Sequence, residues 1–229
     1  MKNGDRPLAS RSVERALARK RSKYEGEVER LVEAAYTVMS EQDTVDPTVS
    51  DILEEAGLST AAFYRHFESK EALLLGAIES GAGRVVTYLA HHMDKVPDPS
   101  EKISAWIRAM FGQLRTTKLL AENRPFLLAY PRLSSAFPEE TDRLSRALRA
   151  PLLEAMNEAV DYDKDTTRDA ETECFLTYQQ VYSLMIYHAA VRQTPTAVMI
   201  ERIVDHCHRA LGLDATKRAT TARRSQNSK

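Results

Sequence analysis

Apolar residues recur at helical spacing along most of this chain, and no stretch of useful length shows the alternation of a β-strand. With 229 residues the chain is long enough to bury a substantial core. The pattern therefore predicts an all-α protein. Longer helices are expected at about 24–41, 69–92, 100–114, 119–130, 138–160, 167–193 and 195–211, with two short helices between Thr48 and Phe67. Prolines should end, kink or open three of the longer helices, at Pro131, Pro151 and Thr194-Pro195 respectively.

Residues 48–73 predict two short helices joined by a tight turn. Thr48 and Asp51 form a capping-box pattern at the start of the first helix. Gly57 can end this helix because glycine accepts the left-handed conformation that a side chain resists. Ser59 is placed to cap the second helix, whose two core aromatics lie four residues apart, Phe63 and Phe67. This arrangement is typical of a helix-turn-helix, in which the second helix enters the major groove of DNA.

The same stretch resembles the TetR family of transcriptional regulators. The resemblance covers roughly residues 25–78 and rests on Thr48, Ala56-Gly57-Leu58-Ser59, Tyr64-Arg65-His66-Phe67 and Ser69-Lys70-Glu71-Ala72-Leu73. It implies an N-terminal three-helix domain that binds operator DNA as a homodimer. It also implies a larger helical domain that binds a small effector and so weakens DNA binding. Helix four would link the two domains, and three glycines make it locally weak, Gly76, Gly81 and Gly83.

Charge is unevenly distributed along the chain, although the formal net charge is only −1. Eight of the first 23 residues are basic and only two are acidic, which fits a DNA-binding arm that follows the minor groove. A second basic stretch at the C-terminus is better explained as a solvated tail. Four segments are expected: a flexible basic arm (1–23), a helix-turn-helix domain (24–68), an effector-binding and dimerisation domain (69–213) and a disordered basic tail (214–229).

Five residues are candidates for contacts with DNA phosphates. Thr48 and Ser59 stand at helix N-termini, where free N–H groups and the helix dipole favour an anion. Tyr64 and His66 lie outside the predicted core, and Lys70 stands in the first turn of helix four, where a nearby phosphate would explain a cation. By resemblance, Tyr64, His66 and Lys70 match positions that contact the DNA backbone in the family.

Base contacts are expected from the exposed part of the second short helix. Thr60 and Ala61 are small and suit methyl contacts to thymine. Arg65 has the only side chain here that can fork onto a guanine, and a purely phosphate-binding role for it is equally compatible with the sequence. By resemblance, Ser50 on the preceding helix also matches a base-contacting position.

The second domain concentrates aromatic and sulfur-containing residues on apolar faces. Each of them is compatible with ordinary core packing, but as a set they fit a pocket between helices for a lipophilic or aromatic effector. No cluster of Lys or Arg indicates a strongly anionic ligand. The pocket candidates are Trp106, Met110, Phe126, Tyr130, Met156, Tyr178, Tyr182 and Met185.

The last two predicted long helices have wide apolar faces, which predicts a homodimer. Under the resemblance, these helices from two subunits would form a four-helix interface. The interface candidates are Ile186, Ala189, Ile203, Val204, Cys207 and Leu211.

Other classes of protein find little support in the sequence. Two cysteines are too few for a disulfide scaffold, and neither a signal peptide nor an apolar run of membrane-spanning length is visible, so a cytoplasmic protein is expected. His206 and His208 point to different faces of a helix, so no metal site is expected; catalytic residues and cofactors are not expected either. The alternatives are an all-helical small-molecule-binding protein or enzyme with a vestigial helix-turn-helix, and a protein-interaction adaptor.

Overall fold

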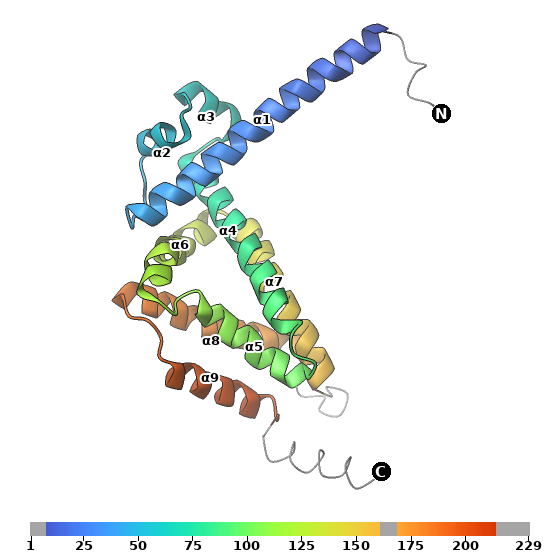
Figure 1. Cartoon of the computed structure of the whole chain (residues 1–229). Helices are drawn as coiled ribbons and strands as arrows, with labels where there is room; N and C mark the ends of the chain where they lie inside the picture. The colour runs from blue at the N-terminus through green and yellow to red at the C-terminus, as the bar shows by residue number, and fades with distance from the viewer. Residues whose placement is uncertain (1–7, 161–168, 214–229) are drawn as a thin grey trace. The chain divides into compact units, whose positions relative to one another are not determined.

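The computed structural model describes residues 8–160 and 169–213, and all regular structure in these ranges is helical (Figure 1). This confirms the predicted all-α class. The described helices are α1 (Leu8–Glu41), α2 (Val49–Ala56), α3 (Thr60–His66), α4 (Lys70–Met93), α5 (Pro99–Gly112), α6 (Thr117–Ala136), α7 (Pro138–Ala159), α8 (Ala170–Val191) and α9 (Ala197–Ala210). The basic tail at 214–229, the first seven residues and the polar turn expected at 162–166 lie outside the described residues.

The chain divides into two compact units, which meet between Ile78 and Glu79. The division falls inside α4, whereas the expected domain boundary lay at its start, between residues 68 and 69. Unit 1 therefore contains α1, α2, α3 and the first turns of α4. Unit 2 contains the remainder of α4 and the helices α5 to α9.

Unit 1 is built on the C-terminal half of α1. Leu31, Ala35 and Met39 are fully buried along one face of this helix. Both α2 and α3 contact α1, and they contribute the buried side chains of Ile52 and Phe63 to the core. Burial of each large apolar side chain stabilises the fold by about 1.5–3 kcal/mol, so this small cluster fixes the positions of the two short helices.

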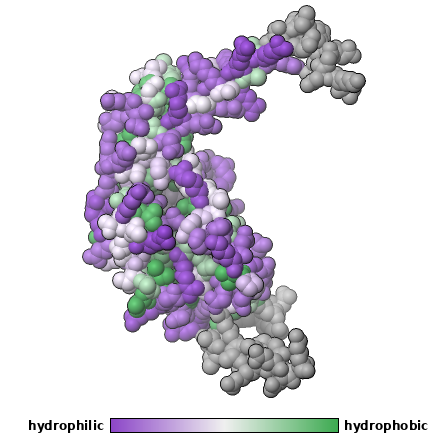
Figure 2. All heavy atoms as spheres, in the orientation of Figure 1, coloured by the Kyte–Doolittle hydropathy of each residue, from purple (hydrophilic) through white to green (hydrophobic). Residues whose placement is uncertain are grey.

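The N-terminal half of α1 corrects the prediction that residues 1–23 form a flexible arm, because the helix begins at Leu8 rather than near residue 24. This part projects beyond α2 and α3 (Figure 1), residues 13–23 are exposed, and its surface is largely hydrophilic (Figure 2). The segment is rich in Arg, Lys, Ala and Glu and has no Gly or Pro between Leu8 and Glu25, so helix propensity favours continuation. An ion pair one turn apart, Arg21 Nε to Glu25 Oε1 at 2.8 Å, adds to this preference.

Unit 2 packs around α5, which contacts α7, α8 and α9, while α6 contacts α7 and α8. Trp106 in α5 is fully buried, and its indole Nε1 donates a hydrogen bond to the backbone carbonyl of Leu148 in α7, at 3.1 Å. The hydrogen bond satisfies the one polar group of a large apolar side chain, as buried tryptophan requires. No helix in the described ranges is long and apolar enough to cross a membrane.

Two predicted helix boundaries in unit 2 are wrong. The helix α6 passes through Pro131 and ends at Ala136. The bounds of α7 agree with the prediction, and Pro151 does not split this helix. A proline inside a helix removes one backbone hydrogen bond, and packing against neighbouring helices can offset that loss. The last helix begins at Ala197, and its N-cap is Thr196 rather than Thr194. The Thr196 hydroxyl accepts the capping hydrogen bond from the Met199 N–H at 3.2 Å.

Candidate functional site

The turn between α2 and α3 has the geometry that the sequence predicts. The Thr48 hydroxyl accepts a hydrogen bond from the Asp51 N–H at 3.1 Å, and the Thr48 N–H donates back to the Asp51 carboxylate at 3.4 Å, which completes a capping box. Gly57 adopts a left-handed φ of 60° at the end of α2. The Ser59 hydroxyl accepts from the Ala62 N–H at 3.3 Å and so caps α3. These local contacts fix the crossing of the two helices of a helix-turn-helix.

One face of α3 is open to solvent and carries three of the base-contact candidates and one phosphate candidate. Ala62 and Phe63 are buried, so the face that turns away from the core presents Thr60, Ala61, Tyr64 and Arg65. Residues three and four positions apart lie side by side on a helix, so these four side chains form one surface. Ser50, on α2, is exposed as well, and so are the two N-cap residues Thr48 and Ser59.

His66 does not lie on this surface, which corrects its expected placement outside the core. Its side chain is only 8% exposed, and Nε2 lies 2.7 Å from Oε2 of Glu27 in α1. The imidazole therefore faces the interior of unit 1. The reason is that His66 follows the buried Ala62 and Phe63 by four and three positions, so it shares the face of α3 that turns toward α1.

Glu27 is the residue that sequence reasoning missed. It is 4% exposed, and the same Oε2 that contacts His66 also accepts a hydrogen bond from Arg65 Nη1 at 2.8 Å. Lys23 Nζ lies 3.8 Å from the other carboxylate oxygen. The hydrogen bond with His66 lowers the pKa of the Glu27 carboxyl; burial opposes this shift, and the charges of Arg65 and Lys23 add to it. A signal was present in the sequence, because position 27 stands one turn before Leu31 on the inward face of α1.

Tyr24 completes the contacts around Arg65 and His66. The Arg65 guanidinium lies 5.6 Å from the centre of the Tyr24 ring, and the His66 ring meets the same tyrosine edge-on at 5.4 Å. Together with Glu27, this ring holds the end of α3 against α1. The Arg65 side chain nevertheless remains 42% exposed.

Lys70, at the first position of α4, is already paired with a carboxylate. Its Nζ lies 2.7 Å from Oδ1 of Asp46, in the loop between α1 and α2, and its side chain is 24% exposed. Ser69 caps α4 by accepting a hydrogen bond from the Ala72 N–H at 3.1 Å. The positive end of the α4 dipole disfavours the Lys70 cation at this position, and the Asp46 carboxylate offsets that repulsion.

A row of cations follows the exposed part of α1. Arg15, Arg19 and Lys23 stand four residues apart, so they share one side of the helix and span roughly 12 Å along it. Lys20 adds a fourth charge, with its ammonium group 5.4 Å from the centre of the Tyr24 ring. Like charges at this spacing destabilise a helix, so an adjacent anion would relieve their repulsion.

The structure brings four of the eight pocket candidates together in one aromatic cluster. The rings of Tyr178 and Tyr182 stack with centres 5.5 Å apart, and Tyr130 meets Tyr182 edge-on at 5.2 Å. Trp106 lies 6.4 Å from Tyr178. The other candidates are three buried methionines and one half-buried phenylalanine, Met110, Met156, Met185 and Phe126.

The three tyrosine hydroxyls differ in their partners. Tyr130 donates to the backbone carbonyl of Thr141 at 3.0 Å. The buried Tyr178 hydroxyl has no hydrogen-bond partner in the part of the chain that the structure describes. Burial raises the pKa of Tyr130, Tyr178 and Tyr182, so all three hydroxyls are neutral near pH 7 and suit an uncharged polar group.

Five of the six dimer-interface candidates are buried within unit 2 itself, which corrects their expected role. Ile186 is half-buried, and the other five are at most 7% exposed, Ala189, Ile203, Val204, Cys207 and Leu211. Ile203, Val204, Cys207 and Leu211 are covered because α9 packs on α5 of the same subunit, and Ala189 belongs to α8, which packs on α6 and α7. The widest apolar stripe of α9 therefore faces its own core and is not available to a second subunit.

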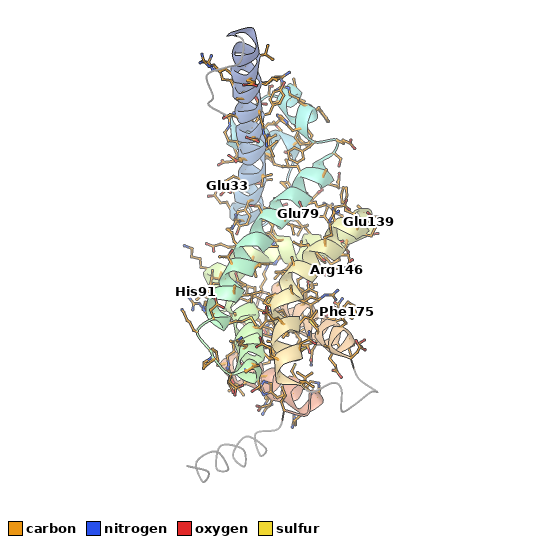
Figure 3. All side chains as sticks on the ribbon, turned by 90° about the vertical axis from the view of Figure 1, so that its right-hand side faces the viewer. Glu33, Glu79, His91, Glu139, Arg146 and Phe175 are labelled. Atoms are coloured by element: carbon orange, nitrogen blue, oxygen red, sulfur yellow. The ribbon has the colours of Figure 1, made fainter. Side chains whose placement is uncertain are left out.

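A different apolar surface is exposed on α8. Leu176 and Tyr187 are 57% and 58% exposed, and Val191 follows at 40%. Phe175, also on this helix, is 43% exposed and is labelled in Figure 3. The exposed residues between them are uncharged, namely Gln179, Ser183 and Ala190. We refer to these seven residues as the α8 face.

The His and Cys residues near the C-terminus do not converge. His206 is exposed, whereas His208 Nε2 lies 2.9 Å from the buried Ser104 hydroxyl. No group of three or more potential metal ligands occurs within 8–160 and 169–213. Burial raises the pKa of the Cys174 thiol to about 12 and that of the Cys207 thiol to about 11, so both stay protonated near pH 7.

Comparison with known proteins gives one consistent result. Residues 31–77 match the family model described as bacterial regulatory proteins, tetR family. The HTH-type transcriptional regulator BetI of Rhizobium meliloti is 34% identical over 145 residues, which cover 62% of this chain and 69% of that protein. Among solved structures, RolR in complex with resorcinol has a TM-score of 0.61 at 19% identity and covers 86% of this chain and 92% of its own. The fatty acid degradation regulator FadR of Bacillus halodurans has a TM-score of 0.58 at 19% identity, covering 81% of this chain and 94% of its own.

Proposed function

This chain belongs to the TetR family of helix-turn-helix transcriptional regulators, and from that membership we propose that it is a homodimeric repressor released from its operator by a small lipophilic or aromatic effector. Regulators of this family bind operator DNA, usually as dimers, and many respond to small molecules. The observation that carries the proposal is the exposed face of α3, which two capped helix starts hold in place.

The proposed DNA contacts divide between the two helices of the motif and the start of α4. The backbone N–H groups in the first turns of α2 and α3, which follow Thr48 and Ser59, would bind phosphates. The side chains of Tyr64 and Lys70 would contact phosphates as well. Base contacts would come from Ser50, Thr60, Ala61 and Arg65, which are all exposed. His66 contributes indirectly in this arrangement, because its side chain is held by Glu27.

The basic half of α1 would add affinity without sequence preference. Arg15, Arg19 and Lys23 present a row of charge that suits successive phosphates of one strand. Because this part of the chain is helical from Leu8, we propose contacts along the DNA backbone in place of an extended arm in the minor groove.

The dimer would form through the α8 face. The seven residues of the α8 face include four large exposed apolar side chains and no charge, and the nearby Arg149 guanidinium lies 5.3 Å from the centre of the Phe175 ring. Such an apolar face is unusual on a monomer, and a second copy of the same helix would cover it symmetrically. This proposal replaces the interface expected from the sequence, because five of its six residues are buried within unit 2.

The effector would bind at the aromatic cluster of Trp106, Tyr130, Tyr178 and Tyr182. The neutral, unpaired Tyr178 hydroxyl supports a ligand with an apolar body and one uncharged hydrogen-bonding group. A neighbour of the same fold, RolR, was solved with resorcinol, an uncharged aromatic ring with two hydroxyl groups. The ligand can lower the affinity for DNA only by as much as it binds one arrangement of the units more tightly than the other. We expect the conformational change to occur in α4, which its glycines weaken.

The experiment that tests this proposal begins with the purified chain and a library of random DNA duplexes. We expect enrichment of a pseudo-palindromic duplex, which the protein binds as a dimer with salt-dependent affinity. Resorcinol and 1-decanol then serve as an aromatic and an aliphatic probe, both of them uncharged. An effective probe should quench Trp106 fluorescence, raise the melting temperature and release the duplex. Failure to enrich any duplex would favour a small-molecule-binding protein or enzyme with a vestigial motif.

A further inference from the structure

The contact between Glu27 and α3 is unusual for a DNA-binding surface. The carboxylate is almost completely buried, and one of its oxygens contacts two consecutive residues of the recognition helix, Arg65 and His66, at 2.8 and 2.7 Å. A negative charge this close to DNA weakens the attraction of the polyanion. Its presence at the end of the helix expected to read bases therefore needs a physical explanation.

Glu27 changes what Arg65 can contribute to binding. An unpaired arginine attracts any phosphate and displaces a counterion when it binds. The Arg65 guanidinium instead has a carboxylate 2.8 Å from Nη1, so its charge is largely compensated before DNA arrives. Long-range attraction through this residue is correspondingly weak.

Short-range recognition by Arg65 is retained. Its side chain is 42% exposed, and it is held at two points, by Glu27 and by the Tyr24 ring. A guanidinium that is already fixed loses little conformational entropy when it makes a directed contact. Paired hydrogen bonds to a guanine edge require such fixed geometry, whereas a phosphate contact does not.

We propose that Glu27 is a positioning residue for specificity: by binding Arg65 and His66, it converts Arg65 from a phosphate contact into a base contact and suppresses binding to non-operator DNA. This inference rests on the proposed function, and it decides between the two roles of Arg65 that the sequence leaves open. His66 acts as the second anchor, which keeps the end of α3 against α1 when Arg65 engages DNA.

The test compares two duplexes of equal length and composition, the one enriched by the wild-type protein and a scrambled version. Glu27→Gln keeps the shape of the side chain but removes its charge. We expect the variant to bind the scrambled duplex about 5-fold more tightly at low salt, with a salt slope steeper by about 0.9 for each subunit. Discrimination between the two duplexes should fall roughly tenfold.

Glu25→Gln is the matched control, because Glu25 lies on the same helix and pairs only with its neighbour Arg21 among the contacts seen, with 56% of its side chain exposed. It should change binding to both duplexes equally and leave the discrimination intact. In the double variant Glu27→Gln/Arg65→Gln, the increase in salt slope that is expected for Glu27→Gln alone should disappear. If Glu27→Gln weakened binding to both duplexes with unchanged slopes, Glu27 would only support the fold and the inference would be wrong.

A second variant keeps the test decisive even if Glu27→Gln does not fold. In the wild-type background, Arg65→Gln should weaken binding to the enriched duplex about tenfold and leave the scrambled duplex and its salt slope nearly unchanged. It should also lose discrimination at one base pair in each half-site. A flatter slope on both duplexes would instead identify Arg65 as a phosphate contact. If the wild-type protein enriches no duplex, the proposed function itself fails, which is a distinct result.

Discussion

The two compact units hold their polar groups in different ways. In unit 1, charged side chains are paired across helices, as in Glu27 with Arg65 and His66, and Lys70 with Asp46. Unit 2 also pairs charges across helices, as in Arg108 with Glu201 at 2.7 Å, but this pair lies at its surface. The polar groups of its aromatic cluster are neutral, and the buried Tyr178 hydroxyl has no partner in the described chain. The two units therefore differ at their candidate sites, with paired charge at the end of α3 in unit 1 and neutral aromatic groups in unit 2.

This difference indicates what each unit can recognise. The compensated charge of Arg65 at the end of α3 favours directed contacts over indiscriminate attraction to DNA, which suits recognition of sequence. A neutral aromatic cluster in unit 2 favours an uncharged ligand of matching shape, because an ion there would lose its hydration. In the predictions that follow, variants of unit 1 are judged by the salt dependence of DNA binding, and variants of unit 2 by the stability of the fold or of the dimer.

The largest effect is expected from a charge on the α8 face. Leu176→Glu places a carboxylate in the proposed dimer interface and should yield a folded monomer that binds the enriched duplex about 100-fold more weakly. Ala147→Glu, at an exposed position of α7, is the control and should stay dimeric. Ile203→Glu should instead unfold unit 2, because that side chain is only 7% exposed. Sizing chromatography of Leu176→Glu as an intact dimer would contradict the proposed interface.

The next effect concerns the row of cations on α1. Arg15→Gln/Arg19→Gln should weaken binding to enriched and scrambled duplexes alike, by about tenfold at low salt, and leave the melting temperature unchanged. The exposed pair Arg143→Gln/Arg146→Gln in α7 removes the same charge from unit 2 (Arg146 is labelled in Figure 3) and should have little effect. Equal losses in both double variants would indicate net charge alone as the cause.

A smaller effect is expected at Lys70. Lys70→Ala should weaken binding to every sequence several-fold and flatten the salt slope by about 0.9 for each subunit. Asp46→Asn should act in the opposite direction, because it frees the ammonium group from its partner at 2.7 Å. Unchanged affinity and slope in Lys70→Ala would show that the lysine serves only Asp46.

In unit 2, Tyr178→Phe removes a buried hydroxyl that has no partner. The melting temperature should rise by about 2–4 °C, since an unsatisfied buried hydroxyl costs on the order of 1 kcal/mol. Tyr187→Phe, at a position 58% exposed, should leave it unchanged. An effector that depends on this hydroxyl should bind Tyr178→Phe about tenfold more weakly. A lower melting temperature in Tyr178→Phe would reveal a stabilising partner for the hydroxyl.

The smallest effect is expected in the reaction of the two cysteine thiols with a thiol reagent, which should be very slow. Cys174 and Cys207 have pKa values raised by burial to about 12 and about 11, so very little thiolate exists at pH 8. The native protein should therefore react with a thiol reagent only as fast as it unfolds, and both thiols should react at once in denaturant. Rapid labelling of the native protein would contradict the buried arrangement of unit 2.

The local parts of the fold follow directly from the sequence. The cap at Thr48, the left-handed turn at Gly57 and the cap at Ser59 each depend on residues within one turn of each other, so their chemistry can be predicted without the fold. The all-α class follows for the same reason, from spacing within each segment. The helical start of α1 was also accessible from propensity, but the density of charge there suggested disorder instead.

The tertiary structure decided which side chains remain available. Glu27 lies 38 and 39 positions from its partners Arg65 and His66, and a pattern along the chain does not encode contacts at that separation. Both α8 and α9 carry wide apolar faces in the sequence, yet packing on α5 buries Ile203 of α9, whereas Leu176 of α8 stays exposed. Residue type and spacing thus determined the helices and the DNA-binding motif, because those depend on neighbours in the chain. Only the packing of distant helices determined the contact of Glu27 with α3, the exposure of the α8 face and the lack of a partner for the Tyr178 hydroxyl among the described residues, because burial depends on neighbours in space.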